Sequence, residues 1–291
     1  MPLTNRRVLM SDTTHFSNDQ HINPYYHDEA INIAKASNEL SAIRQLLSSA
    51  GVEVVSVASP AGSQDGVYTA NWALVRGDTA ILARLPDARK TEENWAEKVL
   101  TELGITVLRV PDGLKFSGQG DALACGNYLF CGQGYRSDEQ AQKFAADTLG
   151  YERIQLQTVP ELDDQGSPVI NSASGWADSF FYDIDLALSI IRPVTDSQKG
   201  LIAYCRDAFT KDSQRIIANL DMVDKIEVSI EEADEAFACN LVSTGETIVM
   251  SENAPNLRAA LESHGLTVVS PSITELVKGG GYIRCTSLCL D

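Results

Sequence analysis

The sequence predicts an α/β fold made of five similar units that close on themselves. Four stretches share one pattern, in which a helical run ends at a glycine and an alternating apolar strand follows. These glycines are Gly51, Gly104, Gly150 and Gly265, and the last interval is about twice as long as the others. A fifth helix-to-strand unit, at 216–228, lies within that long interval.

Each unit follows from its local residues. Glycine supplies the left-handed backbone that ends a helix, and the residues after it change from helical to two-residue periodicity. In the fifth unit, Asp224 stands near the turn instead of a glycine. In chain order, the expected strands lie at 52–55, 105–108, 151–156, after Asp224, and at 266–269.

Repeats of this length are typical of solenoids, propellers and other closed arrays. With only five units and no capping segment, closure is favoured because it removes exposed sheet edges. An ordinary open α/β sheet is the alternative, since a helix, a glycine and a strand follow one another in any such fold. No Gly-, Ser- or Pro-rich linker interrupts the chain, so we expect a single domain over 1–291.

The composition excludes several classes of partner. The chain has 23 Lys and Arg against 40 Asp and Glu, for a net charge of −17, which disfavours nucleic acid and anionic membrane surfaces. We see no signal peptide and no apolar run long enough to span a membrane. The six cysteines are therefore expected to be free thiols in the cytoplasm. A homo-oligomer is compatible with the sequence, which does not define the oligomeric state.

Metal and nucleotide sites are not expected. No C-x-x-C pair occurs, and His15, His21 and His27 are six residues apart in a polar segment, which does not favour a metal cluster. Gly118-Gln119-Gly120 resembles the start of a dinucleotide fingerprint, but Leu123 replaces its third glycine. Because no P-loop is present either, no cofactor is expected.

Four stretches are rich in glycine, polar and aromatic residues, which makes them candidates for a functional site. They cover 64–72, 116–123 together with 132–138, 180–186, and 278–286.

The last stretch contains a candidate nucleophile. Three glycines and Arg284 precede Cys285. The glycines would let the backbone pack closely beneath a nucleophile, and a neighbouring cation would lower the pKa of the thiol. The alternative is an ordinary buried cysteine, since free cysteines are among the most buried residues.

Two carboxylates stand out in the third stretch. Asp183 and Asp185 are two residues apart, so on a strand both would point to one face and could grip a guanidinium. The equally supported alternative is a helix start, where acidic residues stabilise the dipole. Arg136 could hold a substrate carboxylate, or it could be structural.

Together, these stretches resemble the amidinotransferase superfamily of guanidine-modifying enzymes, in particular the dimethylarginine dimethylaminohydrolases and arginine dihydrolases. The likeness runs nearly end to end, and the order and spacing of its motifs are specific. In the first half, it rests on His15-Phe16 with Ile22-Asn23-Pro24, on 65–71 (P-D-x-V-F-T-A-N in the family), on 118–123 (G-E-G-D-A-L) and on 132–138 (G-x-G-x-R-T-D). In the second half, it rests on Phe237-Ala238-Cys239-Asn240 (F-A-C-N) and on 278–285, which resembles the tail with the catalytic cysteine.

The resemblance implies a five-bladed α/β propeller, the pentein fold of ββαβ-type units. It also implies covalent chemistry: a cysteine attacks the guanidine carbon, an amine leaves, and water hydrolyses the thiouronium intermediate. By motif, Cys285 would be the nucleophile and Asp185 a guanidinium ligand. Asn71 and Asp65 would contact the substrate, and Arg136 would bind its carboxylate. The implied partner is a small guanidino or ureido amino acid.

The sequence departs from the family at the proton-transfer residues. The family's F-Y-H-L-D reads 181–185 here, so Asp183 stands in place of the catalytic histidine. The family's F-E-G-E-G-D reads 116–121, so Ser117 and Gln119 replace its glutamates. Two hypotheses remain: a hydrolase or amidinotransferase in which Asp183 transfers protons, or an impaired relative that binds an arginine-like ligand without turnover.

Overall fold

The computed structural model describes residues 4–26 and 28–291 and contains five three-stranded sheets. The first is β15 (Leu288–Cys289), β1 (Arg7–Met10) and β2 (Glu53–Ser56), with α1 (Ile33–Ser49). The second is β3 (Ala73–Arg76), β4 (Thr79–Leu82) and β5 (Thr106–Arg109), with α2 (Lys90–Glu102). The third is β6 (Ala122–Cys125), β7 (Tyr128–Gly132) and β8 (Glu152–Leu156), with α3 (Glu139–Leu149).

The two remaining sheets repeat this arrangement. The fourth is β9 (Leu188–Arg192), β10 (Gly200–Cys205) and β11 (Val223–Val228), with α4 (Lys211–Ala218). The fifth is β12 (Val242–Ser243), β13 (Thr247–Val249) and β14 (Thr267–Val269), with α6 (Pro255–Ser263); α5 (Ile230–Glu235) precedes it. In every sheet, the first strand is antiparallel to the second, and a helix connects the second to a parallel third.

The five predicted units are confirmed. Gly51, Gly104, Gly150 and Gly265 all adopt positive φ, between 72° and 86°, where the helix gives way to the third strand. The fifth unit, which has no glycine at this turn, is α4 followed by β11.

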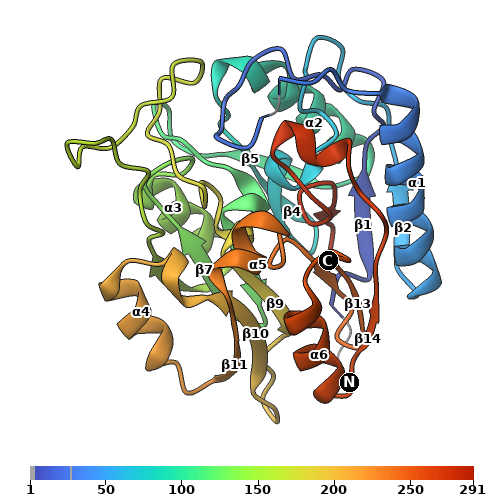
Figure 1. The fold of residues 1–291 in the computed structure, drawn as a ribbon. Coiled ribbons are helices and arrows are strands. Elements are labelled where there is room, and N and C mark those ends of the chain that lie inside the picture. The colour runs from blue at the N-terminus through green and yellow to red at the C-terminus, as the bar shows by residue number, and fades with distance from the viewer. Residues whose placement is uncertain (1–3, 27) are drawn as a thin grey trace.

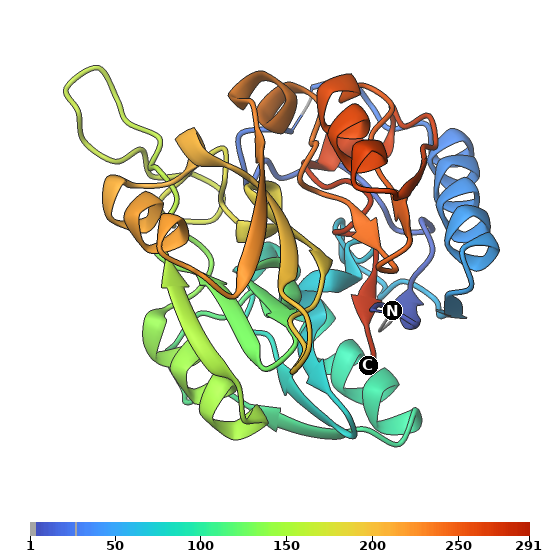
Figure 2. The ribbon, with the colours of Figure 1, turned by 90° about the horizontal axis from the view of Figure 1, so that it is seen from below.

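The sheets surround a common centre, and the helices lie outside them (Figures 1 and 2). The first strands of neighbouring sheets are in contact, as in the pairs β6 with β9, β9 with β12, and β15 with β3. Strand β15, from the C-terminal end, pairs with β1, so both ends of the described chain contribute to the same sheet. The closed arrangement is therefore confirmed, and the open-sheet alternative is wrong.

Short 3₁₀ turns connect the sheets near the centre. The turns η1 (Thr69–Trp72), η3 (Gly118–Gly120) and η4 (Ile184–Leu186) each immediately precede or closely approach a first strand, and η3 contacts both of the others. These turns bring the second, third and fourth sheets' polar segments to one place.

Three further points bear on the sequence predictions. No helix in 4–26 and 28–291 is long and apolar enough to cross a bilayer. All six cysteines are free thiols. His27, one of the three histidines considered for a metal site, lies outside the described residues.

Candidate active site

Cys285 is buried at the centre, with 3% of its surface exposed. Asn240 holds it from two directions: its Nδ2 donates to the thiol Sγ over 3.2 Å, and its Oδ1 accepts the Cys285 amide over 3.2 Å. The thiol donates to Asp185 Oδ2 over 3.5 Å. A cysteine with its main chain and its sulfur both fixed has one defined orientation, which is what a nucleophile requires.

The glycines before Cys285 pack closely, as predicted. A Cβ atom at Gly279 or Gly281 would lie 2.5 Å or less from the Tyr68 ring or hydroxyl, and Gly280 has a φ of +80°. The turn η6 (Leu276–Gly279), just before them, is anchored by Glu39 of α1, whose carboxylate accepts the backbone N–H groups of 274–276. The tail is therefore rigid up to the thiol.

The expectation that Arg284 lowers the pKa of the thiol is wrong. Its guanidinium donates to the Ser287 carbonyl and to Gln119 Oε1 and does not contact the sulfur. Burial and the nearby Asp185 raise the pKa of the Cys285 thiol well above its ordinary value. Without a ligand, the cysteine is therefore a neutral thiol.

Asp183 and Asn71 face each other. Asn71 Nδ2 donates to Asp183 Oδ2 over 2.7 Å and to Ser117 Oγ over 2.9 Å. Gly120 makes this contact possible, since a Cβ there would lie within 2.6 Å of both the Asn71 amide and the carboxylate. The second oxygen of Asp183, Oδ1, is buried and has no hydrogen-bond partner in the part of the chain that the structure describes. It is free to bind a donor from a ligand.

Three buried carboxyls are gathered here: Asp121, Asp183 and Asp185. Burial is the first cause that raises the pKa of each above its ordinary value. The charge of Asp183 adds to the increase at Asp121 and Asp185, whereas Arg136 lowers the pKa of Asp183. Since neighbouring buried carboxyls resist ionising together, a cation placed among them would be strongly stabilised.

The backbone at these acidic residues starts a short helix. Asp183 has extended dihedral angles and caps η4, and Asp185 lies in its first turn. The strand arrangement considered from sequence is wrong, but both side chains still face the centre. They have different partners: Asp185 contacts the thiol, and Asp183 contacts Asn71.

Asp65 also lies at the pocket, but local contacts hold it. Both of its oxygens accept from the Tyr26 hydroxyl at 2.6 Å, and Gln64 Nε2 lies 3.4 Å from Oδ2. Burial, opposed by Arg89, raises the pKa of Asp65 to about 6. An ammonium group beside it would lower that pKa and favour the carboxylate form.

Arg136 is 5% exposed and has spare hydrogen-bonding capacity. One Nη donates to the Ile22 carbonyl, and the guanidinium carbon lies 5.1 Å from the Tyr182 ring and 5.8 Å from the Trp176 ring. Its Nε is buried and has no hydrogen-bond partner within 4–26 and 28–291. Arg136 lowers the pKa values of the nearby Asp183 and Asp178. Among the described residues, none of the ion pairs within 4 Å includes Arg136, so its guanidinium can still bind an anionic group.

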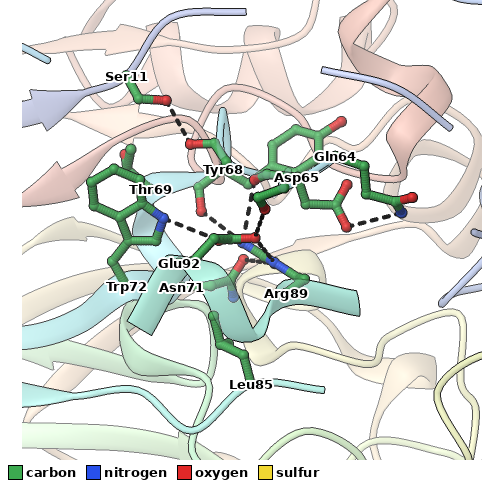
Figure 3. A network of polar contacts seen from close by, with 12 residues as sticks. Ser11, Gln64, Asp65, Tyr68, Thr69, Asn71, Trp72, Leu85, Arg89 and Glu92 are labelled. Atoms are coloured by element: carbon green, nitrogen blue, oxygen red, sulfur yellow. Dashed lines mark hydrogen bonds and ion pairs between the residues drawn. The ribbon is translucent and has the colours of Figure 1, made fainter. Parts of the chain in front are cut away.

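Arg89 forms the polar network drawn in Figure 3. Its Nε and Nη2 donate to the two oxygens of Glu92 over 2.9 and 2.7 Å, and its Nη1 donates to Asn71 Oδ1 over 2.9 Å. Glu92 also accepts from the indole of Trp72. Because Arg89 occupies the amide oxygen of Asn71, the amide nitrogen must point to Asp183.

We expect Arg89→Met to destabilise the protein by about 3–5 kcal/mol, because it leaves the buried Glu92 carboxylate without its cation. Urea unfolding followed by circular dichroism measures the change. The matched control is the double variant Arg89→Met with Glu92→Gln, which should recover part of the loss. A single-variant loss below about 1 kcal/mol would show that the pair is unimportant for the fold.

One small pocket unites most of the predicted residues. It is lined by five of the six: Cys285, Asp183, Asn71, Arg136 and Asp65. Asp185 does not line it; it lies behind the thiol, at the end of a second cavity that opens between the sheets. The predicted site therefore assembles, with the two acidic residues of η4 in different positions.

Other residues of the site were not predicted as such. Asn240 lies in the F-A-C-N stretch, for which the sequence predicts no role. Arg89 and Glu92 lie outside all of the motifs. Trp176 comes from a segment without regular structure and lines the pocket. Only Asn240 had a usable sequence signal, namely its place in a motif shared with the family.

Known proteins are similar to this chain over nearly its full length. The bifunctional arginine dihydrolase/ornithine cyclodeaminase AgrE of Nostoc is 30% identical over 97% of this chain, which spans 37% of AgrE. The N(G),N(G)-dimethylarginine dimethylaminohydrolase of Mycobacterium tuberculosis is 28% identical, with 97% and 85% of the two chains covered.

A solved structure agrees with the fold. The N-terminal domain of ArgZ, an arginine dihydrolase from the ornithine-ammonia cycle in cyanobacteria, superposes with a TM-score of 0.84 at 27% identity, over 98% of this chain and 97% of that one. The sequence profile described as N,N dimethylarginine dimethylhydrolase, eukaryotic, matches residues 7–173. This chain thus belongs to the N,N-dimethylarginine dimethylhydrolase family of guanidine-modifying proteins and has its pentein fold.

Proposed function

We propose that this protein is a hydrolase that cleaves a C–N bond at the guanidino or ureido carbon of an arginine-like amino acid. The observation that carries the proposal is the thiol of Cys285, fixed by Asn240 and Asp185 at a pocket lined by carboxyl groups. The relatives support it by name. AgrE is an arginine dihydrolase, and a variant of the ArgZ domain has been solved covalently bound to a reaction intermediate.

The pocket suits a molecule with a cation at one end and a carboxylate at the other. Asp183 offers its unpartnered Oδ1 to the guanidinium, next to the Asn71 amide. Arg136 offers its unpartnered Nε to the carboxylate, and Asp65 lines the same pocket for an ammonium group. An α-amino acid with a guanidino side chain carries all three groups.

The first chemical step needs a thiolate. A guanidinium bound beside Asp183 and the Cys285 sulfur would lower the pKa values of Asp183, of the thiol, and of Asp185 behind the thiol. Asp185 Oδ2, the acceptor of the thiol hydrogen bond, would then take the proton. The sulfur electron pair forms a bond to the guanidine carbon, giving a tetrahedral adduct.

Asp183 would transfer the remaining protons. Asp183, ionised beside the bound guanidinium, would accept an N–H proton from one nitrogen of the neutral adduct and give it to the departing nitrogen as the C–N bond breaks. The ionised Asp183 then takes a proton from water. That water attacks the thiouronium carbon, the C–S bond breaks, and Asp185 returns the proton to the sulfur.

A ligand-binding protein without turnover is the second candidate, favoured by the absence of the histidine and glutamate that the family places at 183 and 117. It would use the same pocket, with the thiol remaining unreacted. The two functions differ in whether a product is released.

The test is to incubate the protein with arginine, methylated arginines, citrulline and simple amidines, and to detect products by mass spectrometry. We expect release of ammonia or an alkylamine from at least one guanidino amino acid. No product from any compound, combined with thermal stabilisation by one of them, would replace the hydrolase with the binding protein.

A further inference from the structure

A long segment leaves the ring between the third and fourth sheets. Residues 158–180, here named the arm, fold back on themselves through the antiparallel bridges Leu162 to Pro168 and Ile170 to Ala177. Both views of the ribbon show this yellow-green segment projecting from the molecule (Figures 1 and 2). The arm therefore does not form part of a sheet, and its tip is exposed, with Leu162 and Ile170 52% and 60% accessible.

The base of the arm contributes Trp176 to the pocket. Its indole lies against two cations: the Lys115 ammonium is 5.0 Å from the ring centre, and the Arg136 guanidinium carbon is 5.8 Å away. A cation held near an aromatic face is attracted by the ring, and the attraction grows when water is excluded. Trp176 thus contacts the residue proposed to bind the substrate carboxylate.

The arm is also attached to the N-terminal segment, since Asn171 Nδ2 donates to the His21 carbonyl over 3.0 Å. Within the arm, the same nitrogen donates to Asp178 Oδ2 over 2.9 Å. The neighbouring Ile22 carbonyl accepts from Arg136. One short stretch of the N-terminal segment therefore binds both the arm and the guanidinium.

Arg136 depends on these contacts for its position. The described residues give Arg136 one backbone carbonyl, the rings of Tyr182 and Trp176, and the electrostatic attraction of Asp178 and Asp183, but no ion pair within 4 Å. Tyr182 is fixed by its hydroxyl, which donates to the Gly280 carbonyl over 2.8 Å. If Trp176 is removed, the guanidinium loses the ring on the arm and gains access to solvent.

We propose that Trp176 is a specificity-determining residue: by holding Arg136, it makes the pocket select ligands that carry a carboxylate over amidines that lack one. The proposal rests on the proposed function for the identity of the ligand. The arm thus places one aromatic side chain, that of Trp176, at the carboxylate end of the bound substrate.

The experiment compares arginine with agmatine, which has the same guanidinium but no carboxylate. For Trp176→Ala we expect the KM for arginine to rise about tenfold, with kcat changed less than about twofold, and a much smaller rise in the KM for agmatine. Trp176→Phe keeps an aromatic face and should recover most of the affinity. The matched control is Trp95→Ala, because Trp95 on α2 also lies near a lysine, at 5.2 Å, but does not line the pocket.

Binding measurements separate this proposal from the proposed function. Calorimetry with the Cys285→Ser protein, with and without Trp176→Ala, gives the same comparison of arginine and agmatine without turnover. A loss of about tenfold confined to arginine supports the role of Trp176 even if no product forms. Equal losses for both ligands, no loss for either, or a fall in kcat at unchanged KM would overturn it.

Discussion

Replacing Cys285 by serine abolishes product formation, lowering kcat by at least about 10³-fold, because the hydroxyl is a far weaker nucleophile and no imidazole is among the described residues that line the pocket. The exchange keeps the size of the side chain and the hydrogen-bonding capacity toward Asn240 and Asp185. Ligand affinity should therefore stay within a few fold of wild type. Product formation by mass spectrometry and binding by calorimetry measure the two quantities.

The matched control is Cys289→Ser, four residues further along and outside the pocket. It should retain turnover. Alkylation adds an independent measurement: a bound guanidino ligand should protect Cys285 and leave the other five thiols unaffected. Unchanged turnover in Cys285→Ser would remove the cysteine from the mechanism.

Asp183→Asn should lower kcat by about 10²–10⁴-fold, the usual contribution of a general acid and base. The amide can keep the contact with Asn71, so the pocket should retain its shape. The variant cannot give a proton to the leaving amine or take one from water. Steady-state kinetics with the best substrate of the panel measures the loss, and turnover within about tenfold of wild type would contradict the role of Asp183.

The same variant should be more stable than wild type at neutral pH. Burial raises the pKa of Asp183 in the folded protein, so the folded state binds more protons than the unfolded state between the two pKa values. Stability from this group is therefore lost as the pH rises through that window, and the Asp183→Asn substitution would remove the loss. Thermal unfolding from about pH 4 to pH 8 should show a flatter profile for the variant; a steeper one would contradict the sign.

A substitution at Ser117 tests why a carboxyl group is tolerated at position 183. Ser117 donates to Asp183, whereas a glutamate at 117 would place another acidic group beside it. We interpret Ser117 as the residue that makes a carboxyl at 183 tolerable. The two positions are coupled through Asn71, which donates to both. Ser117→Glu should therefore destabilise the protein at neutral pH, as thermal unfolding would show, and an unchanged melting temperature would contradict this interpretation.

The fold could be predicted because its signals are local. Four glycines at positive φ mark helix ends, and the helix-to-strand run at 216–228 adds the fifth unit. The backbone at Asp183 and Asp185 could not be predicted, because two-residue spacing fits a strand as well as the start of a short 3₁₀ turn. Tertiary packing of η4 against η3 decides between them.

The sequence predicts the site residues that belong to motifs. It does not predict those whose role depends on contacts between distant parts of the chain. Cys285, Asn71 and Arg136 reach one pocket from segments far apart in the chain. Arg89 and Glu92 resemble an ordinary ion pair at three-residue spacing on a helix, and only burial makes them a support for Asn71. The pKa of the thiol depends on the carboxyls that surround it in the fold. In the sequence, the neighbour of Cys285 is an arginine, which predicts the opposite shift.

The central claim is that Cys285 bonds to the guanidine carbon. The most direct measurement is the intact mass of the protein, quenched in acid during turnover, followed by peptide mapping. We predict an adduct on the peptide containing Cys285, with the mass of the substrate less the departing amine. In Asp183→Asn, more of this adduct should accumulate if the substitution slows hydrolysis of the adduct more than attack by the thiol. Product release with no adduct in either protein, or an adduct on another cysteine, would contradict the claim.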